Sequence, residues 1–124
     1  MARSQIPQIF PHERRGATLV VRPRGDSLGV QELDLKREID ALHKLIDDPR
    51  VTGLLVDVGQ APYFSSIVLG AVLAMCQKIR GRGGRAAFCN ASPGMLDIMQ
   101  IMKLDSVLPY YATCEEALAA LADA

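Results

Sequence analysis

The chain contains few of the residues on which nucleic-acid binding usually depends. It has no tryptophan, three phenylalanines and three tyrosines, and its 14 basic residues are balanced by 14 acidic ones, so its formal net charge is zero. A nucleic-acid-binding domain is normally basic and often offers aromatic side chains on which bases stack. The composition therefore argues against a nucleic-acid partner.

Cysteine is also scarce. The three cysteines, Cys76, Cys89 and Cys114, are far apart in the sequence and include no CxxC pair. An odd number of widely spaced cysteines predicts neither a disulfide framework nor a zinc site. Cys76 and Cys89 lie within apolar runs, where a cysteine usually acts as a small hydrophobic residue. We therefore expect reduced thiols, no bound metal and a cytoplasmic protein.

Long apolar segments are missing as well. The longest apolar-rich segment, residues 67–76, is interrupted by Gly70 and is too short to span a bilayer. Residues 1–16 contain no continuous apolar stretch of the kind that forms a secretory signal. The sequence therefore predicts no membrane association.

Patterns typical of catalysis do not occur either. His12 and His43, the only histidines, fall in polar surroundings without a neighbouring nucleophile. The basic, glycine-rich segment 78–85 lacks the GK[ST] ending of a phosphate-binding loop and follows a predicted helix instead of preceding one. Its cations would complement the negative end of the helix dipole. We expect neither an enzyme nor a bound cofactor.

What the sequence does contain is an alternation of strand and helix patterns. Strands are expected at residues 5–10, 17–21, 51–58, 85–90 and 107–111, and helices at residues 33–48, 66–80 and 95–104 and after the Thr113 capping box. Residues 12–16 are polar and end in glycine, which predicts a turn. The pattern indicates one α/β domain over residues 1–124, with a four- or five-stranded mixed, mostly parallel sheet packed with about four helices. Pro7 and Pro109 assign the first and last strands to the sheet edges.

The segment 51–85 is central to the functional interpretation. Residues 51–58 are nearly continuous in apolar character, which indicates a strand buried on both faces. Asp57 is the polar exception, and it could either meet a ligand at the strand end or hold the following loop by accepting backbone N–H groups. We favour the second role. Ser65 and Ser66 then open a helix.

The segments that follow resemble a known family when they are taken in order. The chain reads LLVDVGQ at 54–60, SSIVLG at 65–70, RGRGGRAAFCN at 80–90, SPGMLDIMQIMKLDSVLPYY at 92–111 and EEALAAL at 115–121. In order and spacing these segments resemble the STAS domain family, which includes bacterial anti-sigma-factor antagonists and the cytoplasmic tails of sulfate transporters. The resemblance covers most of the chain after Ala17.

The resemblance implies a regulatory, non-enzymatic module that binds a partner protein, expected to be an anti-sigma factor with serine kinase activity. Ser66 falls on the serine that the family phosphorylates, and Ser65 replaces the acidic residue before it. Ile67 and Val68 replace a serine and a glycine of the family motif. The apolar residues close to Ser66 in the sequence, Tyr63, Phe64, Ile67 and Leu69, are expected at the partner interface with Ser65 and Gly70. The resemblance adds Asp26 and Ser27, in the loop after the second strand.

Several alternatives remain open from the sequence. Ser66 could serve only as a helix cap, worth roughly 1 kcal/mol, rather than as a phosphoacceptor. The chain could be a STAS scaffold or sensor that is never phosphorylated and docks a partner or a small apolar ligand. An α/β domain that uses Asp57 for binding or catalysis is a third possibility. The methionines Met95, Met99 and Met102 recur at helical spacing, which suits either the core or an adaptable partner surface.

Overall fold

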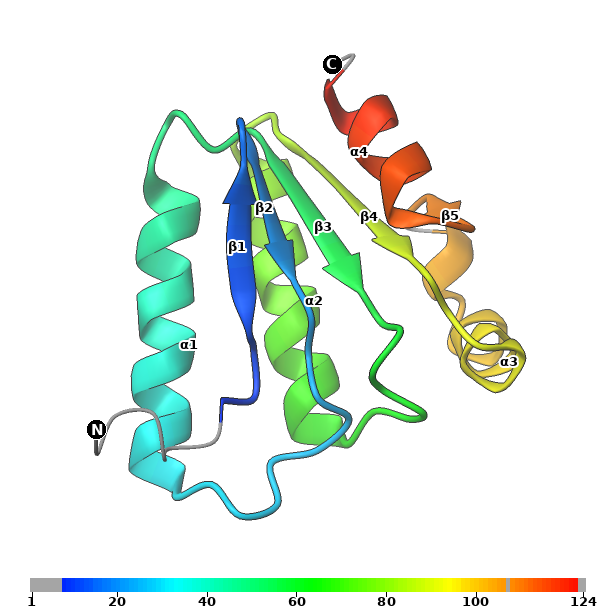
Figure 1. Cartoon of the computed structure of the whole chain (residues 1–124). Coiled ribbons are helices and arrows are strands. Elements are labelled where there is room, and N and C mark those ends of the chain that lie inside the picture. The colour runs from blue at the N-terminus through cyan, green and yellow to red at the C-terminus, as the bar shows by residue number, and fades with distance from the viewer. Residues whose placement is uncertain (1–7, 107, 123–124) are drawn as a thin grey trace.

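The computed structural model describes residues 8–106 and 108–122 (Figure 1). The elements, in chain order, are β1 (His12–Arg15), β2 (Thr18–Val21), α1 (Glu32–Asp47), β3 (Gly53–Asp57), α2 (Ser66–Gly81), β4 (Arg85–Cys89), α3 (Pro93–Ile101), the short 3₁₀ helix η2 (Leu104–Ser106), β5 (Tyr110–Tyr111) and α4 (Cys114–Ala122). The order of strands and helices agrees with the order predicted from the sequence.

One five-stranded sheet forms the centre of the molecule. Its strands are arranged in sequence order, β1-β2-β3-β4-β5. The first pair is antiparallel, whereas β2, β3, β4 and β5 run parallel to their neighbours. The predicted mixed, mostly parallel sheet with about four helices is therefore confirmed.

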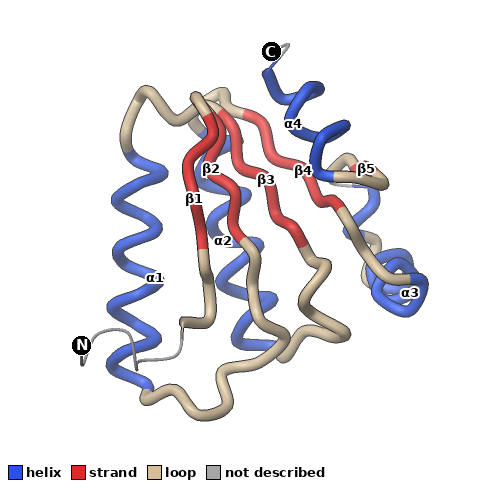
Figure 2. Tube along the Cα trace, in the orientation of Figure 1, coloured by secondary structure: helices blue, strands red, loops and turns tan. Residues whose placement is uncertain are grey.

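Helices cover both faces of the sheet because the central strand is apolar on both. Leu54 and Val56 of β3 join the larger core cluster, which also holds buried residues of α1 and α2. Leu55 points the other way and packs with Ala117 and Leu121 of α4 in a second cluster. Burying a side chain of this size contributes about 1.5–3 kcal/mol. Figure 2 shows α1 and α2 on one side of the red strands and α4 beside β4 and β5.

The prediction for the first strand is wrong. Residues 5–7 lie outside the described part of the chain, and residues 8–10 are not in a strand. Ile9 and Phe10 are instead fully buried, and their N–H groups donate to the Glu38 carboxylate of α1 at 3.0 and 2.5 Å. The first strand is β1, where a turn was expected. Its residues are polar and mostly exposed, as is common in an edge strand, so the sequence has no alternation of apolar residues that would predict a strand here.

Other differences concern the boundaries of elements. The predicted helix 95–104 is α3, which ends at Ile101, because Lys103 adopts a left-handed φ of 60° and η2 begins after it. The last strand contains only Tyr110–Tyr111, and residue 107 of its predicted span lies outside the described residues. Ser92 caps α3 with Pro93 at its first turn, as the sequence predicts.

The parallel arrangement brings two loops to the same end of the sheet. The loop after β2, residues 22–31, and the loop after β3, residues 58–65, both leave the carboxyl ends of their strands (Figure 1). Helix α2 begins at this end, so its first residues lie beside both loops. The topology therefore brings the two predicted interface segments together.

Candidate docking site at the start of helix α2

Ser65 caps helix α2. Its backbone is extended, with φ −71° and ψ 159°, and its Oγ accepts a hydrogen bond from the Val68 N–H at 3.3 Å. Its own N–H donates to the Gly25 carbonyl oxygen at 2.6 Å, which ties the helix start to the loop after β2. An oxygen side chain at this position satisfies one of the N–H groups that a helix leaves free at its start. The capping role that the sequence suggested for Ser66 therefore belongs to Ser65.

Ser66 is the first residue of α2, and its side chain is exposed. No acidic residue occupies the first turn of this helix. The partial positive charge of the helix N-terminus is therefore not offset by a carboxylate of the helix itself. A free hydroxyl at such a position is open to solvent and lies where an added negative charge would be tolerated.

The loop after β2 packs directly against the residues before Ser65. Tyr63 donates its hydroxyl hydrogen to Asp26 Oδ2, and Asp26 Oδ1 accepts the Leu28 N–H at 2.9 Å. A Cβ atom at Gly25 would collide with the Tyr63 carbonyl oxygen, so these two segments of the backbone can approach this closely only with glycine at position 25. Asp26 thus lies beside the helix start.

The contact between Tyr63 and Asp26 changes the acidity of both groups. The Tyr63 hydrogen bond, together with the Leu28 N–H, lowers the pKa of the Asp26 carboxyl below its ordinary value of 3.8. The same hydrogen bond raises the pKa of the Tyr63 hydroxyl above its ordinary value of 10.0. Asp26 is therefore a carboxylate at neutral pH, and its negative charge lies close to the start of α2.

The surface around Ser66 is largely apolar. Ile67 and Tyr63 are 57% and 46% exposed, so both offer apolar area to another molecule. Ile67 also lines a shallow depression whose other residues come from the loop after β2 and from the start of α1, namely Ser27, Val30, Glu32 and Leu35. Two of the predicted interface residues, Ser27 and Ile67, therefore share one depression.

Phe64 and Leu69 are less exposed than the other apolar residues predicted for the interface. Leu69 is buried, at 8% exposure, and Phe64 is half-buried against the main core cluster. Leu69 therefore has little surface left for a partner, whereas Phe64 keeps part of its side chain exposed. The sequence could not separate these two residues from Ile67, because all three are apolar and close to Ser66.

Gly70 is exposed in the second turn of α2, and none of the residues that the structure describes has an atom within 4 Å of the position of a Cβ atom there. Packing within the chain therefore does not require glycine at this position. Gly70 follows Ser66 by four residues, so the two share one face of the helix. Since glycine weakens a helix by roughly 0.5–1 kcal/mol relative to alanine, its presence suits the close approach of another molecule.

The basic segment at the end of α2 makes contacts with other elements of the same molecule. Lys78 Nζ lies 3.0 Å from Asp47 Oδ1 at the end of α1, and Arg82 donates to the Ile46 and Asp48 carbonyl oxygens. Arg85 Nη1 donates to the Ala120 carbonyl oxygen of α4 at 3.0 Å. The cations thus join helix ends to one another. Of the three methionines that recur at helical spacing, Met95 and Met99 are core residues, whereas Met102 is 46% exposed.

Asp57 has the loop-holding role that the sequence favours. Its Oδ1 accepts the Gly59 N–H at 2.9 Å and the Asn90 amide at 3.3 Å, and its Oδ2 lies 3.4 Å from Arg22 Nε. Cys89 and Cys114 also lie close to this carboxylate. No local sequence pattern indicates that grouping, because the three residues belong to elements far apart in the chain.

Among the described residues, no helix is both long and apolar enough to cross a membrane. No curated protein matches the sequence. Solved structures that resemble the chain include an anti-sigma-factor antagonist (STAS) domain protein from Planctomyces limnophilus, at TM-score 0.72 and 20% identity over 91% of this chain and 97% of that one.

Two structures of SpoIIAA share the fold as well. The unphosphorylated form superposes with a TM-score of 0.71 at 21% identity, over 93% of this chain and 97% of that chain. The phosphorylated form of the Bacillus protein, described as a cell fate determinant, gives a TM-score of 0.66 at 23% identity, over 90% and 97%. The model of the STAS domain matches residues 10–117 of the sequence. The chain therefore belongs to the STAS domain family.

Proposed function

We propose that this protein is an anti-sigma-factor antagonist whose docking surface, at the start of α2, is switched by phosphorylation of Ser66. The proposal rests on the observation that the two adjacent serines have different structural roles. Ser65 caps the helix, so Ser66 has no capping role to give up when it is modified. Its hydroxyl is exposed at a helix N-terminus with no acidic residue in the first turn.

The docking surface consists of Ser66, Ile67 and Gly70 on α2, with Tyr63 before the helix and Asp26 and Ser27 on the adjacent loop. In the unmodified protein this surface joins exposed apolar side chains to a small hydroxyl and a glycine. Such a surface suits a partner that buries Ile67 and approaches the helix backbone closely at Gly70. An anti-sigma factor with serine kinase activity would place its catalytic site against the hydroxyl that it modifies.

Phosphorylation would change this surface without unfolding it. A phosphoserine carries about −1.5 to −2 charges and three acceptor oxygens at neutral pH. The helix N-terminus tolerates that charge, whereas a partner that covers Ile67 would have to desolvate it. The modified protein would therefore keep its fold and lose its partner.

The proteins with a similar structure support both parts of this proposal, the antagonist function and the phosphorylation. SpoIIAA has been solved in phosphorylated and unphosphorylated forms, and the Planctomyces protein is described as an anti-sigma-factor antagonist. We extend to this chain the antagonist function and the phosphorylation that are stated for those relatives. A cytoplasmic location and a role in transcriptional regulation belong to the same proposal.

One observation favours a second function. Ser65 occupies the position that is acidic in the family motif, so a kinase that reads this carboxylate would not find it next to Ser66. A STAS scaffold or sensor that docks a partner through the same surface, without phosphorylation, is the alternative. Both functions use the depression that Ser27 and Ile67 line, and they differ only in whether Ser66 is modified.

Phosphate mapping and partner capture from the native cells test the proposal. We expect intact-mass analysis to find a phosphorylated fraction whose phosphate maps to Ser66, and tagged wild type and Ser66→Ala to capture the same partner. Ser66→Asp should capture little of it. The matched control is Ser65→Asp, because aspartate is a good helix cap and restores the acidic residue of the family motif. Equal capture by wild type and Ser66→Asp, with no phosphate on Ser66, would favour the unphosphorylated scaffold.

A further inference from the structure

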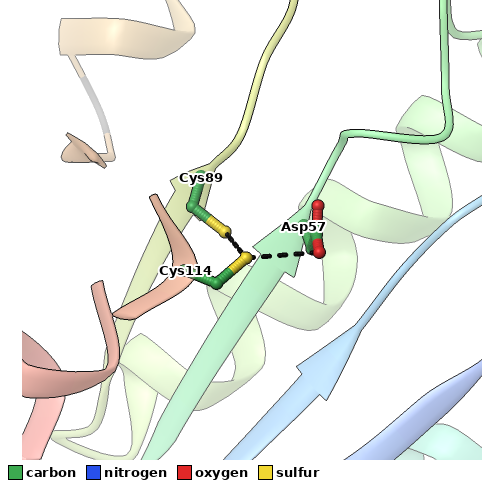
Figure 3. Close-up of side chains that lie close together, drawn as sticks. All are labelled: Asp57, Cys89 and Cys114. Carbon is green, nitrogen blue, oxygen red and sulfur yellow. Dashed lines mark hydrogen bonds between the residues drawn. The ribbon is translucent and has the colours of Figure 1, made fainter. Parts of the chain in front are cut away.

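A pair of thiols lies on the face of the sheet that α4 covers. Asp57 ends β3 and Cys89 ends β4, and the two residues are paired in register. Cys114 is the first residue of α4. Figure 3 shows the three side chains converging from these three elements, with Cys114 between the other two. This grouping is separate from the docking surface and has no part in the proposed function.

The two sulfur atoms are in direct contact. Cys89 Sγ lies 2.7 Å from Cys114 Sγ, and Cys114 Sγ lies 3.2 Å from Asp57 Oδ2. The backbone fixes this approach, because the Asn90 N–H donates to the Tyr111 carbonyl oxygen at 3.3 Å and Thr113 Oγ1 caps the helix that Cys114 begins. We propose that Cys89 and Cys114 form an intramolecular disulfide bond when the protein meets a peroxide.

The reaction needs one peroxide for each pair of thiols. Cys114 is partly exposed and Cys89 is buried, so the peroxide reaches Cys114 first. The Cys114 sulfur attacks one peroxide oxygen and becomes a sulfenic acid, the O–O bond breaks, and the departing hydroxide takes up the thiol proton to leave as water. Cys89 then attacks the Cys114 sulfur and displaces a second water. Two electrons pass from the two sulfurs to the peroxide.

Asp57 orients the thiol that reacts first. Its Oδ2 accepts the Cys114 S–H at 3.2 Å and so holds this sulfur beside Cys89. Arg22 Nε, 3.4 Å from the same oxygen, keeps the carboxylate paired when the thiol hydrogen bond is lost. The other carboxylate oxygen, which holds Gly59, takes no part in the reaction. The loop after β3 therefore keeps its anchor.

A metal ion is a poorer occupant of this site. The three donor atoms lie within 4.8 Å of one another, but tetrahedral zinc holds thiolates at about 2.3 Å each and so keeps two sulfurs roughly 3.8 Å apart. The sulfurs here are much closer. The Arg22 guanidinium already supplies a positive charge to Asp57. The site therefore suits two thiols that react with each other.

Burial governs how quickly the pair reacts. It raises the pKa of both thiols above the ordinary value of 9.0, so the thiolate is scarce at neutral pH. Oxidation should therefore be slower than for an exposed cysteine and should accelerate as the pH rises. The bond would close a loop between residues 25 apart in sequence, which contains α3, η2 and β5. Closing such a loop restricts the unfolded chain and should raise the denaturation midpoint.

Intact-mass analysis of the peroxide-treated protein tests the proposal. Wild type should lose about 2 Da, the mass of the two thiol hydrogens, and a non-reduced peptide map should join Cys89 to Cys114. Reduction should reverse both changes. Cys76→Ser is the matched control, since Cys76 is buried in α2 and should not affect the cross-link. Cys89→Ser should instead gain about 16 Da at Cys114, one sulfenic oxygen.

The peptide map of wild type alone decides the question if a serine variant fails to fold. Oxygen addition without the 2 Da loss, a cross-link that involves Cys76, or a disulfide between two copies of the chain would overturn the proposal. Zinc that is retained by the freshly purified protein and lost on Cys114→Ser would also overturn it, in favour of a metal site.

Discussion

At the scale of single residues, the two adjacent serines have different roles. Ser65 satisfies a backbone N–H at the helix start and is held in turn by the Gly25 carbonyl oxygen. Ser66 is exposed one residue later. The helix start thus has one hydroxyl with a structural role, on Ser65, and one exposed hydroxyl, on Ser66, where we propose the phosphorylation. The sequence alone could not distinguish them, because either serine can cap a helix that begins within one residue of it.

This difference predicts unequal effects on stability. Ser65→Ala should lower the free energy of unfolding by about 1 kcal/mol, because the Val68 N–H loses its partner. Ser66→Ala should change it by less than about 0.5 kcal/mol, as is usual for an exposed side chain without a structural contact. Urea denaturation of the two variants beside wild type measures both values. A larger loss for Ser66→Ala than for Ser65→Ala would reverse the assignment of the cap.

The loop contact predicts a measurable titration. The Tyr63 hydrogen bond lowers the pKa of Asp26 in the folded protein below the ordinary carboxyl value of 3.8. The contact therefore contributes its full stabilisation of the folded state at pH values above 3.8, and this contribution is lost as the pH falls through the lower pKa of the folded state. Carboxyl-carbon NMR of wild type should place the Asp26 midpoint below 3.8. In Tyr63→Phe the midpoint should rise toward that value. An unchanged midpoint in the variant would show that the hydroxyl does not control Asp26.

At the scale of elements, helix α2 combines a buried face with a surface of small exposed residues. Val68, Val72, Met75 and Ile79 face the core, while Ser66 and Gly70 lie on the exposed side. An exposed glycine in a helix that has space for a side chain weakens the helix without helping the fold. Its position beside Ser66 is explained if a partner approaches the helix there.

Gly70→Ala therefore separates stability from binding. The substitution should raise the free energy of unfolding by about 0.5–1 kcal/mol, because alanine favours the helix and meets no neighbouring atom. It should weaken partner binding, because the added methyl group stands where the partner approaches. Denaturation and a binding titration on the same preparation measure the two effects. Ala74→Gly, further along the exposed side, is the control and should lower stability with little effect on binding.

The elements also show how far the sequence predicts the structure. Apolar periodicity identified β2, β3, β4, α1 and α2, because these elements bury regular faces. It missed β1, whose polar residues pair along the sheet edge, and it placed a strand where Ile9 and Phe10 enter the core without one. It also missed the Asp57, Cys89 and Cys114 group, since contact between distant residues leaves no local pattern.

At the scale of the whole molecule, the fold brings together the segments that form the proposed docking surface. Parallel pairing of β2 with β3 sets the loops after these strands side by side, and the Ser65 and Tyr63 contacts join the loops at the helix start. α1 and α2 bury one face of the sheet and α4 the other, so neither core depends on Ser66. Modification of this serine can therefore change the surface without disturbing either core.

The affinity of the partner for defined forms of the protein tests this claim most directly. Unmodified protein and protein with phosphoserine at position 66 would be titrated with the captured partner by calorimetry, after circular dichroism shows that both are folded. We predict that the phosphate weakens binding by at least roughly 100-fold, about 3 kcal/mol. The reason is that the phosphate dianion would lose its hydration in the interface without gaining an opposite charge to pair with. Equal affinity of the two forms would contradict the proposed switch.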